Sequence, residues 1–289
     1  MATVDTPHLL LSALALGAAY ALVAVGFVLT LNAAGAVNFA HGDSVMLGGV
    51  AAVLLGVAAQ AAGWRVPGVV LLPLVILLGA ALGLAIGAAG FLPLKDRPPS
   101  AVFVATIAIA SIFEQSATAF FGPAPRSAPP VWREGTAQPL AMIAVAALVL
   151  GAVYVVLERT QLGRRFRALA QDREMARALG IPATPLIAAA FAAGGGLAGL
   201  AGALLGHQFF VVANQGPGYM LKAYIAVVIG GWGSVPGALA GALLIALFET
   251  FVAASLSAVW AQALLFIAVL LVLLLRPQGL FGEPAGRRA

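Results

Sequence analysis

The sequence contains no cysteine. This absence excludes a disulfide framework, a thiolate metal site and a cysteine nucleophile. Lysine is scarce as well, since Lys95 and Lys222 are the only two, and neither lies in a GxxxxGK[ST] phosphate-binding loop. The GxSxG and HExxH motifs of serine hydrolases and zinc peptidases are also missing. We therefore expect a chain that is not an enzyme, has no ATPase site of its own and holds no metal or cofactor.

Charged residues are equally scarce. They make up 9% of the chain, whereas 62% of the residues are hydrophobic and the mean hydropathy is +1.06. Such values are incompatible with a soluble protein of 289 residues and predict a polytopic membrane protein. The net charge of +5 comes mostly from arginines in short segments between apolar runs and in the C-terminal tail. That placement is typical of membrane topology signals, and it does not indicate a nucleic-acid partner.

The apolar runs predict an all-α transmembrane helical bundle that forms a single domain over residues 1–289. Each predicted span is close to the ~20 residues that cross ~30 Å of hydrocarbon. The first run is too long for a signal-peptide core and is expected to remain as a span. The eight clear spans are residues 9–31, 44–62, 68–92, 101–121, 138–157, 186–212, 234–254 and 259–275. A ninth, from Tyr219 to Ile229, is short and is followed by several glycines, so it is either a half-helix or a bent crossing.

The distribution of basic residues predicts the topology. If the charged segment that starts near Glu158 is cytoplasmic, Lys95 and Arg97 also fall inside and the N-terminus falls outside. The C-terminal arginines, Arg276, Arg287 and Arg288, are also expected inside. Only nine crossings satisfy both conditions.

Glycines recur every four residues in several of the predicted spans. The four series are Gly79, Gly83 and Gly87; Gly195 and Gly199; Gly202 and Gly206; and Gly233, Gly237 and Gly241. Such spacing predicts smooth helix faces that let backbones approach closely in lipid. A few of these glycines could instead give a solute access to the backbone.

Polar residues interrupt the apolar pattern between the first two spans. This stretch, NAAGAVNFAHGD, contains Asn38, His41 and Asp43. In one interpretation it is a turn in which Asp43 caps a helix that begins near Ser44 and Gly42 supplies the bend. In the other, these residues line a translocation pathway or its gate, because irregular polar backbone at membrane depth is tolerated where it lines a cavity.

Two acidic residues, Glu114 and Glu249, lie well inside predicted spans. An ionised carboxylate there costs roughly 2.5–3.5 kcal/mol or more, so each must face protein or water. Both are counted, with Asn38, His41 and Asp43, among the candidate residues of the translocation pathway or gate. Each is either a proton or cation site or one member of an interhelical hydrogen bond, in which Gln115 and Gln262 could be the partners. His207 is expected to be an interfacial hydrogen-bonding residue rather than a metal ligand.

Nine of the 25 charged residues lie between Glu158 and Arg177. The sequence here predicts short helical segments that end at Gly180 and Pro182. Short helices need a surface to lie against. We expect a cytoplasmic loop at about residues 158–185 that docks a soluble partner, with anionic lipid headgroups as the alternative surface.

Four passages resemble the inner-membrane permeases of the branched-chain amino acid ABC importers. They are GAAYALVAVGFVLTLNAAGAVNFAHGDSVMLG, RTQLGRRFRALAQDREMARALGI, LKAYIAVVIGGWGSVPGALAGALL and LLLRPQGLFG, and they follow the family order over nearly the whole chain. The resemblance implies a multi-pass subunit of the bacterial inner membrane that moves branched-chain or related small amino acids into the cytoplasm.

The same resemblance implies partners and a coupling site. The partners are a second, related permease, two ATPase subunits that bind ATP, and a periplasmic solute-binding protein. The residues implied to contact the ATPase are Gly163, Arg167, Ala168, Asp172, Ala176 and Gly180. Two other functions stay open at this point. One is an ion-coupled secondary transporter that uses Glu114 and Glu249, and the other is a membrane scaffold that moves no solute.

Overall fold

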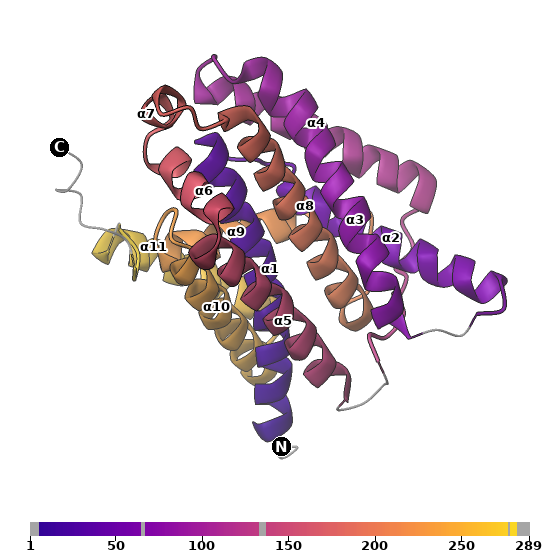
Figure 1. Ribbon diagram of the computed structural model, residues 1–289. Helices are drawn as coiled ribbons and strands as arrows, with labels where there is room; N and C mark the ends of the chain where they lie inside the picture. Colours follow the sequence, from indigo (N-terminus) through magenta and orange to yellow (C-terminus); the bar gives the residue numbers. More distant parts are fainter. Residues whose placement is uncertain (1–5, 65–66, 133–136, 277, 282–289) are drawn as a thin grey trace.

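The computed structural model describes residues 6–64, 67–132, 137–276 and 278–281, and these residues form a helical bundle (Figure 1). The long helices are α1 (Thr6–Ala34), α2 (His41–Ala61), α3 (Gly68–Ile86), α4 (Pro99–Phe121), α5 (Ala137–Arg159), α8 (Ala183–Gln208), α10 (Val235–Ser255) and α11 (Ala258–Leu275). Three shorter helices are α6 (Gln161–Gln171), α7 (Arg173–Ala178) and α9 (Gly216–Gly230). Within the described residues, eight helices are long and apolar enough to cross a membrane, which confirms the predicted fold class.

Two helices form the centre of the bundle. α1 is apolar on every face. In the most apolar 18-residue stretch of α1, 89% of the residues are buried, and in that of α8 the fraction is 78%. A helix that is hydrophobic all round belongs in the interior of a bundle. α1 packs against α8 and α10, and α8 packs against α2 and α3. α4 lies on one flank and α11 on the other, as Figure 1 shows.

Glycines bring the helix backbones together, as their spacing predicted. A Cβ atom on Gly83 of α3 would lie inside 3 Å of the Phe191 carbonyl oxygen of α8, and one on Gly195 would meet Gly79 just as closely. α9 and α10 touch in the same way through Gly230 and Gly237. These contacts confirm close backbone packing, which stabilises helix pairs in lipid.

Gly233 is an exception to the predicted series. It lies in the turn before α10 with a φ of +80°, and its carbonyl oxygen accepts a hydrogen bond of 2.9 Å from Asn32 at the end of α1. Its lack of a side chain therefore permits a left-handed turn, and the prediction that it belongs to a helix face was wrong.

Two helices begin inside the bundle. His41, the first residue of α2, contacts the Val23 carbonyl oxygen of α1, which lies 11 residues, or about 16 Å, before the end of that helix. α9 has 15 residues, about 22 Å, and is too short to cross ~30 Å of hydrocarbon. The N-termini of α2 and α9 touch where Gly42 faces the backbone of Gly216. The predicted ninth segment is therefore a half-helix, and it ends at Gly230 as its glycines indicated.

Candidate functional site

The charged segment after α5 folds into two short helices, which we call the α6–α7 element (residues 161–178). Thr160 caps α6 by accepting a hydrogen bond of 3.2 Å from the Gly163 amide, and Asp172 caps α7 by accepting one of 2.9 Å from the Met175 amide. Side-chain caps satisfy amides that have no partner inside the helix. Gly180, with a φ of +76°, follows α7 and permits the turn away from it. The predicted short helices and their glycine terminator are confirmed.

The α6–α7 element rests on the bundle through one face. Phe166 and Leu169 of α6 and Ala176 of α7 are buried, and Gly163 is buried against the last turn of α5, where a Cβ atom would collide with the Leu157 carbonyl oxygen. These contacts give the element a fixed place on the bundle, as a short helix requires.

Two arginines tie the element to neighbouring helices. Arg167 donates a hydrogen bond to the Leu157 carbonyl oxygen and pairs with Glu158 at 3.1 Å. Arg173 donates a hydrogen bond of 2.7 Å to the Ala33 carbonyl oxygen at the end of α1. Burial, together with the nearby Arg177, lowers the pKa of Arg173 from its ordinary value. Both contacts are internal, so these two side chains position the element on α5 and α1.

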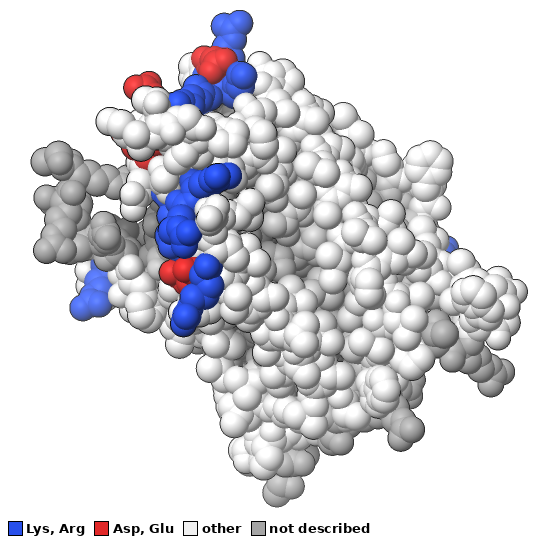
Figure 2. Space-filling view, in the orientation of Figure 1, with Lys and Arg blue, Asp and Glu red and all other residues white. Residues whose placement is uncertain are grey.

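The opposite face of the element is exposed. Met175 and Leu179 are 57% and 72% exposed, and Asp172 and Gly180 are exposed as well, whereas Ala168 is half-buried. Figure 2 shows that Lys and Arg side chains gather along the edge formed by this element and the turn before α4, while most of the remaining visible surface carries no charge. The exposed face thus combines basic and apolar side chains, a composition that suits a soluble protein partner.

The polar stretch at the start of α2 is buried where α1, α2 and α9 meet. Asn38, His41 and Asp43 are each 3% exposed or less. The Asn38 side chain accepts a hydrogen bond of 3.2 Å from the Ala40 amide, and the His41 Nε2 lies 2.9 Å from the Val23 carbonyl oxygen. One carboxylate oxygen of Asp43 has no hydrogen-bond partner in the described part of the chain.

The predicted cap by Asp43 was wrong. α2 begins at His41, its N-cap is Ala40 without a side-chain hydrogen bond, and Asp43 lies in the first turn. There a carboxylate is stabilised by the positive end of the helix. Gly42 lies inside the helix, where its missing side chain admits the start of α9, and it does not bend the chain.

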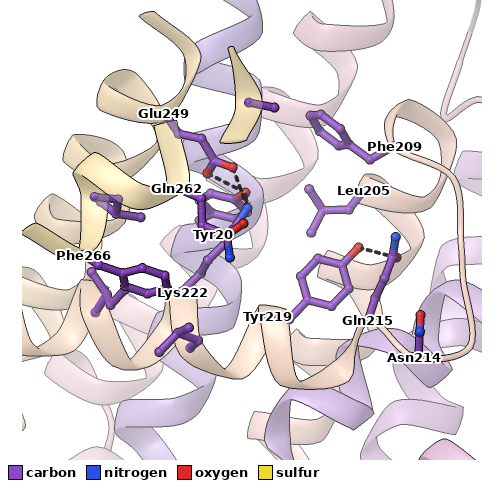
Figure 3. A pocket seen from close by; sticks show the side chains of 15 residues that line it. Tyr20, Leu205, Phe209, Asn214, Gln215, Tyr219, Lys222, Glu249, Gln262 and Phe266 are labelled. Carbon is purple, nitrogen blue, oxygen red and sulfur yellow. Dashed lines mark hydrogen bonds and ion pairs between the residues drawn. The ribbon is translucent and has the colours of Figure 1, made fainter. Parts of the chain in front are cut away.

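Glu249 and Glu114 occupy different environments. Glu249 accepts a hydrogen bond of 3.0 Å from the Tyr20 hydroxyl and forms an ion pair of 2.7 Å with Lys222. Gln262 lines the same cavity, but it is not the partner of Glu249 (Figure 3). Glu114 is half-buried on α4, which packs against α2. The structure therefore places Glu114 on a helix beside α2, and it places Glu249 in a separate cluster with Lys222 and Tyr20.

Sequence reasoning missed Lys222 and Tyr20. The signal was present, because Lys222 is one of only two lysines and lies in an apolar segment. A cation inside a membrane span needs an acidic partner, and Glu249 is itself predicted to lie inside a span. His207 was interpreted correctly as a hydrogen-bonding residue, since its Nδ1 lies 2.9 Å from the Ala128 carbonyl oxygen.

Comparison with known proteins agrees with this architecture. Residues 9–274 match the family model described as the permease component of branched-chain amino acid transport systems. The chain is 32% identical to the high-affinity branched-chain amino acid permease protein BraD of Pseudomonas aeruginosa, over 95% of each chain. It is 29% identical to LivH of Escherichia coli, over 93% of each. The autoinducer 2 import permease LsrC of Yersinia enterocolitica is 35% identical over 34% of this chain and 29% of its own length.

No solved structure matches the chain significantly. The family match extends from within α1 to within α11, and the relatives align over nearly their full length. This multi-pass membrane protein belongs to the family of permease components of branched-chain amino acid transport systems.

Proposed function

We propose that the chain is the permease subunit of an ABC importer in the bacterial inner membrane. It moves branched-chain or related small amino acids into the cytoplasm, paired with a second, related permease. Two separate ATPase subunits bind ATP and drive transport, and a periplasmic binding protein delivers the solute. The observation that carries this proposal is the family match over residues 9–274, because BraD and LivH are named as branched-chain amino acid permease proteins.

The α6–α7 element is the proposed contact with an ATPase. The six residues proposed for this contact divide into two groups. Asp172 and Gly180 are exposed, whereas Gly163, Arg167, Ala168 and Ala176 set the shape and position of the element. Its exposed apolar residues, Met175 and Leu179, would supply the buried centre of the interface.

The contacts of the element suggest how a movement would reach the transport pathway. Arg173 links α7 to the end of α1, and Arg167 links α6 to α5. α1 is the central helix and packs on α8 and α10. ATPase closure would therefore shift the element and, through these contacts, the helices around α1. Such a shift is proposed to open the pathway at Asn38, His41 and Asp43.

The orientation of the chain in the membrane follows from the end of the bundle that carries the α6–α7 element. The basic edge in Figure 2 is proposed to face the cytoplasm, in agreement with the usual excess of arginine and lysine on that side. α1 then runs from outside to inside, which leaves the N-terminus outside.

The C-terminal segment is proposed to be cytoplasmic as well. The Leu280 amide donates a hydrogen bond of 2.7 Å to the Ile229 carbonyl oxygen near the end of α9, and the turn after α9 contacts Asn32 at the end of α1. The half-helix α9, together with the non-helical residues 209–215 before it, is thus proposed to make the ninth crossing. Arg287 and Arg288 lie outside the described residues.

The ion-coupled alternative predicts transport without an ATPase and depends on intramembrane carboxylates. Glu249 has a cationic partner in Lys222, which meets its need for a counter-charge without a transported ion. This contact favours the importer. Glu114 is proposed to lie along the pathway, because α4 packs against α2, the helix that carries His41 and Asp43.

Co-purification from the native membrane tests the proposal. The tagged chain is expected to retain an ATPase subunit, identified by mass spectrometry and by ATP hydrolysis. The Leu179→Glu variant should lose that subunit, because it places a carboxylate at the exposed apolar part of the α6–α7 element. Trp64→Glu is the matched control, since Trp64 is 68% exposed at the end of α2. An intact, correctly inserted chain that never retains an ATPase would overturn the proposal.

A further inference from the structure

The ion pair between Lys222 and Glu249 lies beside a cavity. Lys222 comes from α9, Glu249 from α10 and Tyr20 from α1, and the lysine contacts both of the others. About a quarter of each charged side chain remains accessible, 27% for Lys222 and 24% for Glu249. Figure 3 shows these charges at one side of the cavity. The pair is therefore open to a solute that enters it.

The cavity has the size and lining of a small-molecule site. Its volume is about 430 Å³, within the roughly 300–1,000 Å³ typical of such sites. Gln215 accepts a hydrogen bond of 3.1 Å from the Tyr219 hydroxyl on the side away from the ion pair. Leu205, Phe209 and Phe266 supply apolar surface between and around these polar groups. The cavity therefore places one pair of opposite charges beside an apolar wall. It is complementary to a solute that also carries two opposite charges next to an apolar group.

A partly buried ion pair is weak evidence for a purely stabilising role. Removing two charges from water costs several kcal/mol per ion, and well-packed neutral residues often replace such a pair with no loss of stability. Here the pair is only partly enclosed, and both charges face the same cavity. An accessible pair can exchange its internal contact for contacts with a ligand.

From this geometry we infer that the cavity binds a zwitterionic α-amino acid with an apolar side chain. The carboxylate of the solute pairs with Lys222, its ammonium group pairs with Glu249, and its side chain lies on the apolar wall. Tyr20 holds the Glu249 carboxylate in place. Two ion pairs replace one, and the net charge of the site does not change, so a zwitterion fits better than an amine or an acid. The inference rests on the proposed function and adds a solute site to it.

Release follows from the same arrangement. Lys222 and Glu249 are already 2.7 Å apart, so their own ion pair competes with the solute for both charges. A site of this kind binds weakly and empties easily, as a transport pathway requires. Solute selection would then combine the charge pair with the shape of the apolar wall.

The absence of cysteine makes a direct test possible, because a single introduced thiol reports on the cavity. Gly218 lines the cavity, and a side chain there would meet nothing within 4 Å, so Gly218→Cys is expected to react with a water-soluble methanethiosulfonate. In the complex assembled with its ATPase subunits, leucine, isoleucine or valine should slow this labelling by about fivefold at several times the Kd. Gln60→Cys, in a separate cavity at the end of α2, should label without protection.

Two comparisons make the test decisive. 3-Methylbutylamine lacks the carboxylate of leucine and 4-methylpentanoate lacks its ammonium group, so neither should protect Gly218→Cys. The double substitution Lys222→Met with Glu249→Gln leaves no unpaired charge and should abolish protection by leucine. Equal protection by the single-charge analogues, or no protection by any of the three amino acids, would overturn the inference. If the double variant fails to assemble, the analogue series decides alone.

The outcome also separates this inference from the proposed function. ATP-driven leucine uptake without protection at Gly218→Cys would contradict the solute site and leave the importer proposal intact. Absence of any associated ATPase would contradict the importer proposal, whatever the labelling shows.

Discussion

The Gly83→Leu substitution probes one of the close helix contacts in the bundle. A side chain at this position would start inside 3 Å of the Phe191 carbonyl oxygen and at 3.0 Å from the Gly195 Cα atom. Both are backbone atoms of α8, so no rotamer change can relieve the collision and the two helices must separate. Because Gly83, Phe191 and Gly195 are all buried, the separation also disturbs neighbouring contacts.

The expected magnitude follows from two opposing terms. Inserting a side chain into a packed interior costs about 1–3 kcal/mol, and a wedge between two backbones belongs at the upper end of that range. Replacing a helical glycine returns about 1 kcal/mol of conformational free energy. We expect a net loss of about 2 kcal/mol. This loss corresponds to a fall of about 4–8 °C in apparent Tm.

The assay is thermal denaturation of the detergent-solubilised chain followed by size-exclusion chromatography. Gly151→Leu is the control, because Gly151 is exposed on α5 and a side chain there would meet nothing within 4 Å. The control should keep or slightly raise the apparent Tm. Equal Tm values for the two variants would refute the close packing of α3 on α8.

Three further predictions concern the polar contacts. Asp172→Ala removes the cap of α7 and should cost about 1 kcal/mol locally, seen as faster hydrogen exchange of α7, whereas Glu174→Ala, which removes an exposed first-turn carboxylate without a cap hydrogen bond, should change it less. Arg173→Gln loses the charged hydrogen bond to Ala33, worth about 1.5–3 kcal/mol, and should lower uptake while membrane expression stays normal. His41→Leu removes a buried contact with α1 and should lower the apparent Tm; an unchanged Tm would show that this contact contributes nothing.

Much of the fold could be predicted from the sequence, because lipid imposes a simple rule on span length and polarity. The eight predicted spans match the long helices to within a few residues at most boundaries, and the glycine spacing predicted their packing. The sequence located the end of α9, since its apolar run ends at glycines that include Gly231 with a φ of +115°, but it left open whether the segment is a half-helix or a bent crossing.

The candidate site could be predicted less well, because it depends on which helices become neighbours. From its position in the sequence, Asp43 was predicted to cap a helix. α2 instead begins two residues before Asp43, at His41, which contacts a carbonyl oxygen of α1. The pairing of Lys222 with Glu249 joins residues 27 positions apart on different helices. No local pattern specifies such a contact, although the rule that an intramembrane cation needs a counter-charge could have suggested it.

The most direct test of the account is leucine uptake into proteoliposomes that contain this chain, its partner permease, the ATPase subunits and the binding protein. The account predicts uptake that requires ATP on the side of the ATPases and stops when they are omitted. Leucine movement by this chain alone, driven by a proton or sodium gradient without ATP, would contradict it.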